Sequence, residues 1–139
     1  MGIRMLEANK IRISANTLLI GRSHMGIAIE GGRECLVHRN QIKKYMAGNA
    51  KDIRENSLQG GVFLYKRNEK FDCSANSITE NTIEGFKASI NVLCAGQYAE
   101  PIHITKNQLS SVFLKEEGAS IIEENTDLQG QISVDATLY

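Results

Sequence analysis

The chain of 139 residues has the length of one ordinary domain, and its 42% hydrophobic and 23% charged residues are typical of a folded globular protein. No apolar run approaches the ~20 residues that a membrane-spanning helix needs, so we expect no membrane span. The N-terminus lacks the features of a signal peptide, although one could have been trimmed away, and the three scattered cysteines are too few for a disulfide framework. We therefore expect a cytoplasmic protein.

The net charge of zero conceals an uneven distribution along the chain. Residues 1–69 contain 12 Lys and Arg against 6 Asp and Glu, which gives a net charge of +6. Residues 70–139 contain 4 Lys and Arg against 10 Asp and Glu, which gives −6. Such an asymmetry bears on partners and association rather than on the fold.

Short strands are predicted along most of the chain. Residues 10–14 alternate apolar and polar side chains, as a half-buried strand does. Further strands are predicted from apolar or alternating runs, in chain order at residues 18–20, 25–29, 35–37, 62–65, 71–74, 78–80, 86–94, 101–104 and 132–138. Gly31 and Gly32 separate two of these runs and predict a hairpin between them.

One helix is predicted in each half of the chain, over about residues 39–46 and 106–116. The apolar residues at the helical spacing i, i+3, i+4 are Ile42, Tyr45 and Met46 in the first helix and Leu109, Val112 and Phe113 in the second. Thr105 and Gln108 fit a capping box at the start of the second helix. The Asn-Gln pairs at residues 40–41 and 107–108 are interpreted as side chains that satisfy helix-start amides, with a ligand amide or a base edge as the alternative partner.

Four stretches of the first half recur in the same order in the second half. The matched stretches are residues 10–17 with 70–77, 27–29 with 90–92, Ile42 with Leu109, and 55–60 with 124–130. We interpret them as an internal duplication, with repeat unit one at residues 1–66 and repeat unit two at residues 67–139 in one compact fused domain. Each unit is predicted as strand, strand, strand, helix. The predicted fold class is therefore α+β and β-rich, with the two units related by a pseudo-twofold axis.

Candidate catalytic and metal-binding groups are few. Cys35 and His38 have the spacing of a soft-metal pair, with Cys94 and His103 as available partners, but structural zinc sites normally use two tight pairs. The interpretation we favour is three buried thiols and partly exposed histidines. No phosphate-binding glycine motif and no nucleophile–histidine–acid order stands out. We therefore expect no metal and no cofactor and do not favour an enzyme, although a pocket between the two units is left open.

A basic cluster lies on and around the first predicted helix. Its residues are Arg33, His38, Arg39, Lys43, Lys44, Lys51 and Arg54. Such a cluster can neutralise phosphates, and the nearby Tyr45 can stack on a base. Against nucleic-acid binding, the second unit has Ser110 and Ser111 where the first has two lysines.

One local stretch bears on the same alternative. Ile27-Ala28-Ile29 followed by Glu34-Cys35-Leu36-Val37-His38-Arg39 and then Ile42 is similar to the end of carbon storage regulator proteins, which are small RNA-binding dimers built from strands and a helix. The resemblance is confined to residues 27–42. It implies that Arg39 contacts RNA.

The leading hypothesis for function is a non-enzymatic interaction or assembly protein that works through protein–protein contacts. In its sharpest form, the basic unit of one molecule contacts the acidic unit of another, so the protein self-associates into an oligomer. The simpler explanation of the asymmetry is that the opposite charges attract each other within one molecule. The alternative function is an RNA- or single-strand-binding regulator that uses the basic first unit.

Overall fold

The computed structural model describes residues 2–21, 25–45, 60–66, 70, 72–86, 88–94, 100–116, 120–127 and 133–135. Within these residues every regular element is a strand, and every strand pair is parallel. The predicted α+β fold class is therefore wrong, and so are the two predicted helices wherever the structure describes them. The hairpin expected around Gly31 and Gly32 is also wrong, because the two strands that it would join belong to different sheets.

The strands form three parallel sheets, which we call A, B and C. Sheet A contains β1 (Ile3–Asn9), β4 (Met25–Arg33), β7 (Gly60–Tyr65), β10 (Ile90–Cys94), β13 (Ser111–Glu116) and β16 (Ser133–Asp135). Sheet B contains β2 (Arg12–Ser14), β5 (Leu36–His38), β8 (Ser77–Thr79), β11 (Ile102–Thr105) and β14 (Ser120–Glu123). Sheet C contains β3 (Thr17–Ile20), β6 (Gln41–Lys44), β9 (Thr82–Glu84), β12 (Gln108–Leu109) and β15 (Thr126–Asp127).

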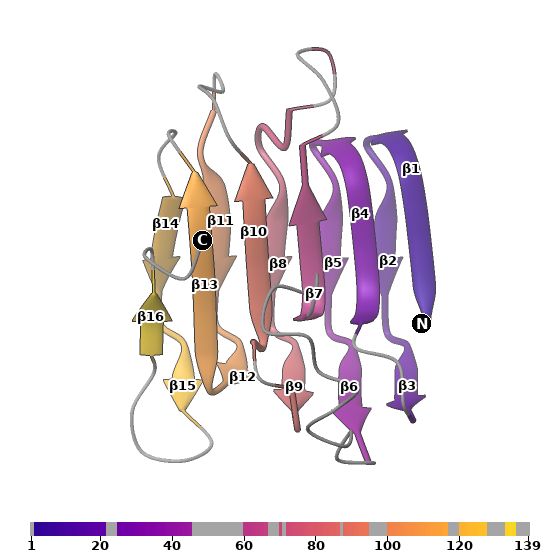
Figure 1. Cartoon of the computed structure of the whole chain (residues 1–139), viewed down its shortest axis with the longest axis vertical. Helices are drawn as coiled ribbons and strands as arrows, with labels where there is room; N and C mark the ends of the chain where they lie inside the picture. Colours follow the sequence, from indigo (N-terminus) through magenta and orange to yellow (C-terminus); the bar gives the residue numbers. More distant parts are fainter. Residues whose placement is uncertain are drawn as a thin grey trace, which may run out of the picture.

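The chain visits the three sheets in the same order in every turn, which makes the protein a parallel β-helix. We number the turns as coils: coil 1 is β1–β3, coil 2 is β4–β6, coil 3 is β7–β9, coil 4 is β10–β12 and coil 5 is β13–β15, after which β16 returns to sheet A. Figure 1 shows the coils side by side, with coil 1 at the N-terminal end. Successive coils are related by a shift along one axis, so the predicted pseudo-twofold arrangement is wrong.

The core is a set of side-chain columns inside the coils. Each inward position carries a branched apolar residue in coil after coil, as in the fully buried columns Ile27–Val62–Ile90–Val112 in sheet A and Val37–Ile78–Ile104 in sheet B. β-Branched side chains favour strands and pack well on a pleated surface. Because each coil lies between two others, its inner side chains are covered by its neighbours as well as by its own opposite walls.

An asparagine stands at the corner between sheets B and C in every coil. Its side-chain amide donates to the asparagine of the next coil, with Nδ2–Oδ1 distances of 3.0 Å along the whole series Asn16, Asn40, Asn81, Asn107 and Asn125. The residue before each asparagine is non-glycine with a positive φ: Ala15, Arg39, Glu80, Lys106 and Glu124. This left-handed conformation costs energy for a residue with a Cβ. The asparagine ladder offsets that cost by satisfying buried backbone groups at the corner.

The helical spacing that predicted the second helix has a simple structural origin. Leu109 is a buried inward residue of sheet C, Ser110 forms the corner, and Val112 is the first buried inward residue of the following strand in sheet A. An i, i+3 pair of buried residues therefore lies on two strands separated by a turn. The Thr105 hydroxyl is not a helix cap, because its Oγ1 lies 3.2 Å from the Thr79 Oγ1 of the neighbouring coil.

The sequence matches have mixed outcomes. Ile27 and Ile90 share one column, and Ile42 and Leu109 share another, so these two matches are equivalent positions two coils apart. Asn16 and Asn76 are not equivalent, because Asn76 lies at the other end of sheet B and its Oδ1 accepts from the Cys35 amide at 2.9 Å. The unit boundary between residues 66 and 67 stays a prediction.

The cysteines do not form three buried thiols as expected. Cys73 and Cys94 form a disulfide, and Cys35 is the free thiol of the three. Burial raises the pKa of the Cys35 thiol. The sequence led us to expect no membrane span. The described part of the chain contains no helix with the length and apolar character needed to cross a bilayer.

Candidate functional site

The predicted basic cluster is confined to coil 2 where the structure describes it. Arg33 ends β4, His38 ends β5, Arg39 forms the corner, and Lys43 and Lys44 lie in β6. Lys51, Arg54 and Met46 lie outside the described residues. The structure therefore brings five of the seven predicted site residues onto one turn of the β-helix.

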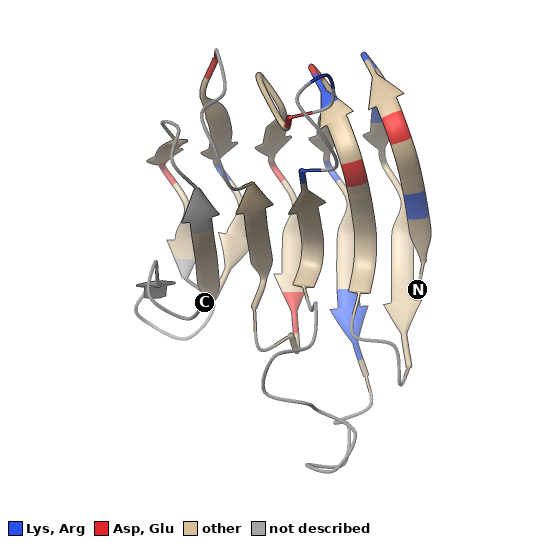
Figure 2. Cartoon of the chain, turned by 45° about the horizontal axis from the view of Figure 1, so that its top comes forward, with Lys and Arg blue, Asp and Glu red and all other residues tan. Residues whose placement is uncertain are grey.

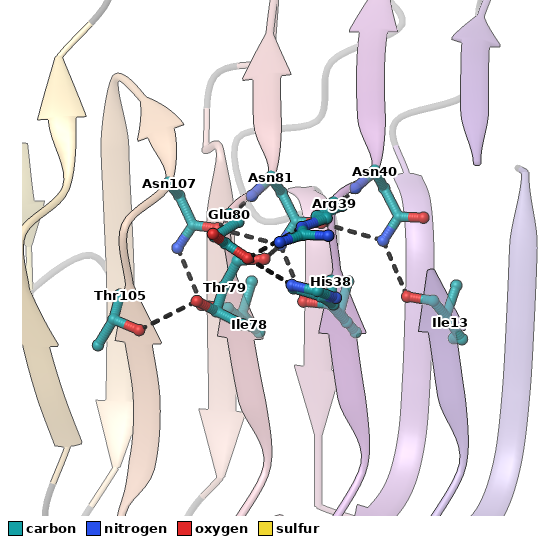
Figure 3. Close-up of polar contacts among 11 residues, drawn as sticks. Ile13, His38, Arg39, Asn40, Ile78, Thr79, Glu80, Asn81, Thr105 and Asn107 are labelled. Atoms are coloured by element: carbon teal, nitrogen blue, oxygen red, sulfur yellow. Dashed lines mark hydrogen bonds and ion pairs between the residues drawn. The ribbon is translucent and has the colours of Figure 1, made fainter. Parts of the chain in front are cut away.

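Four of these side chains are engaged with carboxylates of coil 3. The Arg33 Nε lies 3.3 Å from the Asp72 Oδ1, the Arg39 Nε 3.2 Å from the Glu80 Oε2, and the Lys43 Nζ 3.5 Å from the Glu84 Oε2. His38 Nε2 makes a close contact with the same Glu80 oxygen. Figure 2 shows the blue end of β6 beside the red end of β9, and Figure 3 shows His38 and Arg39 converging on Glu80.

The same four contacts join the two oppositely charged halves of the sequence. Each basic side chain, His38 included, belongs to residues 1–69, and each carboxylate to residues 70–139. The hydrogen bond from His38, followed by the positive charge of Arg39, holds the pKa of Glu80 below its usual value. Intramolecular pairing therefore accounts for part of the charge asymmetry, and less of the basic cluster is left to neutralise phosphates. The RNA contact implied for Arg39 stays a prediction.

A second surface, which the sequence did not indicate, lies at the N-terminal end of the β-helix. Coil 1 supplies the first strand of each sheet, and no described strand lies on its outer side. On β2 and β3 its backbone bonds to coil 2 fall on alternate residues: Ile11 O accepts from Leu36 N, Ala15 N donates to His38 O, and Ile20 O accepts from Tyr45 N.

The intervening residues of coil 1 direct their backbone groups away from coil 2, because peptide groups alternate along a strand. On β2 and β3 these residues are Arg12, Ser14, Thr17 and Leu19. We call this set the N-terminal edge. Unpaired strand edges are templates for pairing with another chain.

Several apolar side chains of coil 1 are less covered than their counterparts in coil 2, although Ala8, Ile13 and Ile20 are buried. Ile3, Met5, Ile11 and Leu18 pack against the core but remain only partly buried, whereas the residues above them in coil 2 are buried. On the outer faces, Leu6 is 51% exposed and Leu19 is 68% exposed.

The asparagine ladder also ends open at coil 1. Asn16 donates its backbone amide and its Nδ2 to the Asn40 Oδ1, both at 3.0 Å. In the inner coils each asparagine Oδ1 accepts these two bonds from the preceding coil, and Asn16 has no described coil before it. The sequence carries a signal for this ladder in the five asparagines, each followed by Thr or Gln.

Other candidate sites are less developed. A half-open groove of about 290 Å³ crosses sheet C in coils 1–3 and is lined by Thr17, Leu18, Leu19, Gln41, Ile42, Lys43, Thr82 and Glu84. Among the described residues, no three His, Cys, Asp or Glu side chains gather where they could hold a metal ion. Cys94, considered as a metal partner for Cys35 and His38, is bonded to Cys73 instead.

Comparisons of the chain with protein-family models, with curated proteins and with solved structures found no match.

Proposed function

We propose that this protein is a non-enzymatic assembly protein that works through protein–protein contacts, with the N-terminal edge as its contact surface. The observation that carries the proposal is the set of four outward-directed backbone positions on coil 1, Arg12, Ser14, Thr17 and Leu19. The strands β2 and β3 present them next to partly buried core side chains such as Ile11 and Leu18. A partner that covers this end would supply hydrogen bonds and bury apolar surface at the same time.

The contact between oppositely charged halves of two molecules is the rival form of the same function. It is weakened by the ion pairs that His38, Arg39 and Lys43 make with coil 3 of their own chain. The two forms respond differently to salt. Exposed charge pairs are screened at ~0.5 M salt, where the Debye length is about 4 Å, whereas backbone pairing and apolar burial persist.

Sedimentation velocity over a wide range of protein concentration, at low salt and at ~0.5 M salt, tests the proposal. We expect association at both salt concentrations. Replacing the two exposed leucines of coil 1 by lysine (Leu6→Lys with Leu19→Lys) should weaken it by at least about tenfold, since charges would have to be buried in the contact. The control is Tyr45→Lys, because Tyr45 is 62% exposed and lies on coil 2.

Each outcome of that experiment has a defined meaning. A wild-type protein that stays monomeric under all conditions would overturn self-association. Association that is lost at high salt would favour the charged halves over the N-terminal edge. Equal weakening by the Tyr45→Lys control would remove the assignment to coil 1.

The cellular compartment of the protein bears on where such an assembly would form. A cytoplasmic protein was expected from the sequence, and this stays a prediction. The Cys73–Cys94 disulfide argues against it, because disulfides persist mainly in oxidising compartments.

A further inference from the structure

We propose that Cys35, Cys73 and Cys94 form a thiol–disulfide switch, in which the free thiol of Cys35 exchanges into the disulfide and moves the cross-link by one coil. In the structure Cys73 of coil 3 is bonded to Cys94 of coil 4, and Cys35 of coil 2 is the free thiol. After the exchange Cys35 is bonded to Cys73, and Cys94 is free. The observation that carries the inference is that the three cysteines lie on successive coils, where the chain passes from sheet A to sheet B.

Backbone hydrogen bonds establish which residues are equivalent at this corner. Glu34 N donates to Ser74 O at 2.9 Å, which is the bond that neighbouring parallel strands make when Glu34 pairs with Ala75. Glu34 and Ala75 also share a positive φ. Cys73, two residues before Ala75, therefore occupies in coil 3 the position that Gly32 occupies in coil 2.

The sulfur of Cys35 lies beside that position. It is 3.4 Å from the Arg33 carbonyl oxygen, and a Cβ at Gly32 would lie 3.3 Å from it. Coil 3 does carry a Cβ there, that of Cys73, one strand spacing of ~4.8 Å along the stack. Asn76 joins the two residues, because its Oδ1 accepts from the Cys35 amide at 2.9 Å and its Nδ2 donates to the Cys73 carbonyl at 3.0 Å. We infer that rotation of the two side chains brings the sulfur atoms together.

Cys94 is out of reach of Cys35. It ends β10 in coil 4, two coils away, and two strand spacings amount to ~9.6 Å. The Cα atoms of a disulfide usually lie about 4.4–6.8 Å apart, and those of Cys73 and Cys94 are 6.5 Å apart. The folded stack therefore permits the pairs Cys73–Cys94 and Cys35–Cys73, and it excludes Cys35–Cys94.

The exchange conserves one disulfide and needs no oxidant or reductant. The Cys35 thiolate attacks the Cys73 Sγ, so that a Cys35–Cys73 bond forms while the Cys73–Cys94 bond breaks. The electron pair of the broken bond leaves with the Cys94 sulfur, which takes up a proton in place of the one that Cys35 released. Coils 2 and 3 are then joined covalently, and the covalent link between coils 3 and 4 is lost.

Burial makes the exchange slow at neutral pH. Cys35 is 2% exposed, and burial raises the pKa of its thiol, so little thiolate is present to attack. We expect the exchange rate to rise by about tenfold for each pH unit until the pH reaches the pKa of this thiol, because the thiolate is the nucleophile.

Disulfide mapping of the full chain tests the switch. The protein is incubated without reductant at a series of pH values around about 8.5, the pKa of an ordinary thiol. It is then labelled with N-ethylmaleimide in denaturant at acidic pH and digested with trypsin, which has sites between each pair of cysteines. Mass spectrometry without reduction should show Cys94 becoming labelled with time, in step with the Cys35–Cys73 peptide and at a rate independent of protein concentration.

Two controls accompany the wild type. Cys35→Ser removes the attacking thiol, so its Cys94 should stay unlabelled throughout. Wild-type protein in concentrated urea should form all three pairings, including Cys35–Cys94, because the unfolded chain has no coils to keep them apart.

Three results would overturn the inference. The first is that Cys35 remains the labelled thiol of the wild type at every pH. The second is a Cys35–Cys94 peptide as abundant in native buffer as the Cys35–Cys73 peptide, which would mean that exchange takes place in the unfolded chain. The third is a rate proportional to protein concentration, which would mean that exchange takes place between molecules.

Discussion

Coil 3 and coil 1 are built from the same three strands and the same corner, yet they differ in what covers them. Coil 3 lies between two other coils, and its inward residues Val62, Ile78 and Ile83 are fully buried. Coil 1 has a described neighbour on one side, and its inward residues Ile3, Met5 and Leu18 are only partly buried, although Ile13 is buried. We therefore expect the position of a coil in the stack, rather than its own sequence pattern, to decide how much its side chains contribute to the free energy of unfolding.

The asparagine ladder shows the same contrast. Asn81 accepts from the Asn40 amide of coil 2 at 2.9 Å and donates its Nδ2 to the Asn107 Oδ1 of coil 4 at 3.0 Å, so it is bonded to both neighbouring coils. Asn16 donates to one neighbour, and its Oδ1 has no donor among the described residues. Identical residues at equivalent corners should therefore differ several-fold in their contribution to stability.

The largest expected effect comes from removing an inner ladder residue. Asn81→Ala leaves the buried Asn40 amide without its acceptor and the Val37 carbonyl without a donor, and each unsatisfied group costs about 1–3 kcal/mol. We expect the free energy of unfolding to fall by about 4 kcal/mol. The measurement is the urea midpoint with its slope.

The matched control for that substitution is Asn16→Ala, for which we expect a loss of about 1 kcal/mol. Equal losses for Asn16→Ala and Asn81→Ala would mean that neighbouring coils do not determine the contribution of a rung. A smaller loss of unfolding free energy for Asn81→Ala than for Asn16→Ala would contradict the expected difference between inner and outer coils.

The second effect concerns the core column of sheet C. Leu109 in coil 4 is fully buried and Leu18 in coil 1 is partly buried, although both belong to the same inward column. Leu109→Ala should cost about 3 kcal/mol and Leu18→Ala about 1 kcal/mol, because the cavity left at the open end is accessible to water. Thermal and urea unfolding of the two variants at one low protein concentration would check the difference. A loss at Leu18 as large as that at Leu109 would show that coil 1 is covered after all.

Only some of the strands could be predicted from the sequence: the apolar residues 62–65 do form part of β7, whereas β6 and β13 lie where helices were predicted. The arrangement of the strands could not be predicted. The parallel stacking depends on contacts between residues far apart in the chain, which no local pattern reports. The corner asparagines are spaced by 24, 41, 26 and 18 residues, so loops of unequal length conceal the period. Reading Asn followed by Thr or Gln as one recurring corner, rather than as helix starts, would have revealed the five coils.

The candidate site was predictable only in part. The basic residues Arg33, Arg39 and Lys43 do lie together on one coil, as their proximity in sequence suggested. Their carboxylate partners are 39 to 41 residues away in the chain, so the pairing follows from the stacking of coil 3 on coil 2. The N-terminal edge could not be read from side chains at all, because what distinguishes it is the direction of backbone groups.

The smallest expected effect tests the ion pairs between coils. The hydrogen bond from His38 and the charge of Arg39 lower the pKa of Glu80 in the folded protein. A lowered carboxyl pKa contributes stability that is present above the unfolded value, roughly 4.3, and is lost as the pH falls through the folded value. Wild-type protein should therefore lose its advantage over Glu80→Gln as the pH falls from neutral to below about 4.3, measured as urea midpoints across a pH series.

Glu34→Gln gives the corresponding test at the open end. Glu34 contacts the single Lys10 of coil 1 at 3.6 Å, whereas Glu80 contacts two side chains of coil 2. Exposed pairs contribute little on their own, so we expect Glu34→Gln to lower the urea midpoint at neutral pH by less than Glu80→Gln does. Parallel curves for wild type and Glu80→Gln at every pH would show that the cluster between coils 2 and 3 contributes nothing to folding. The inner coils would then owe their stability to the ladder and the core alone.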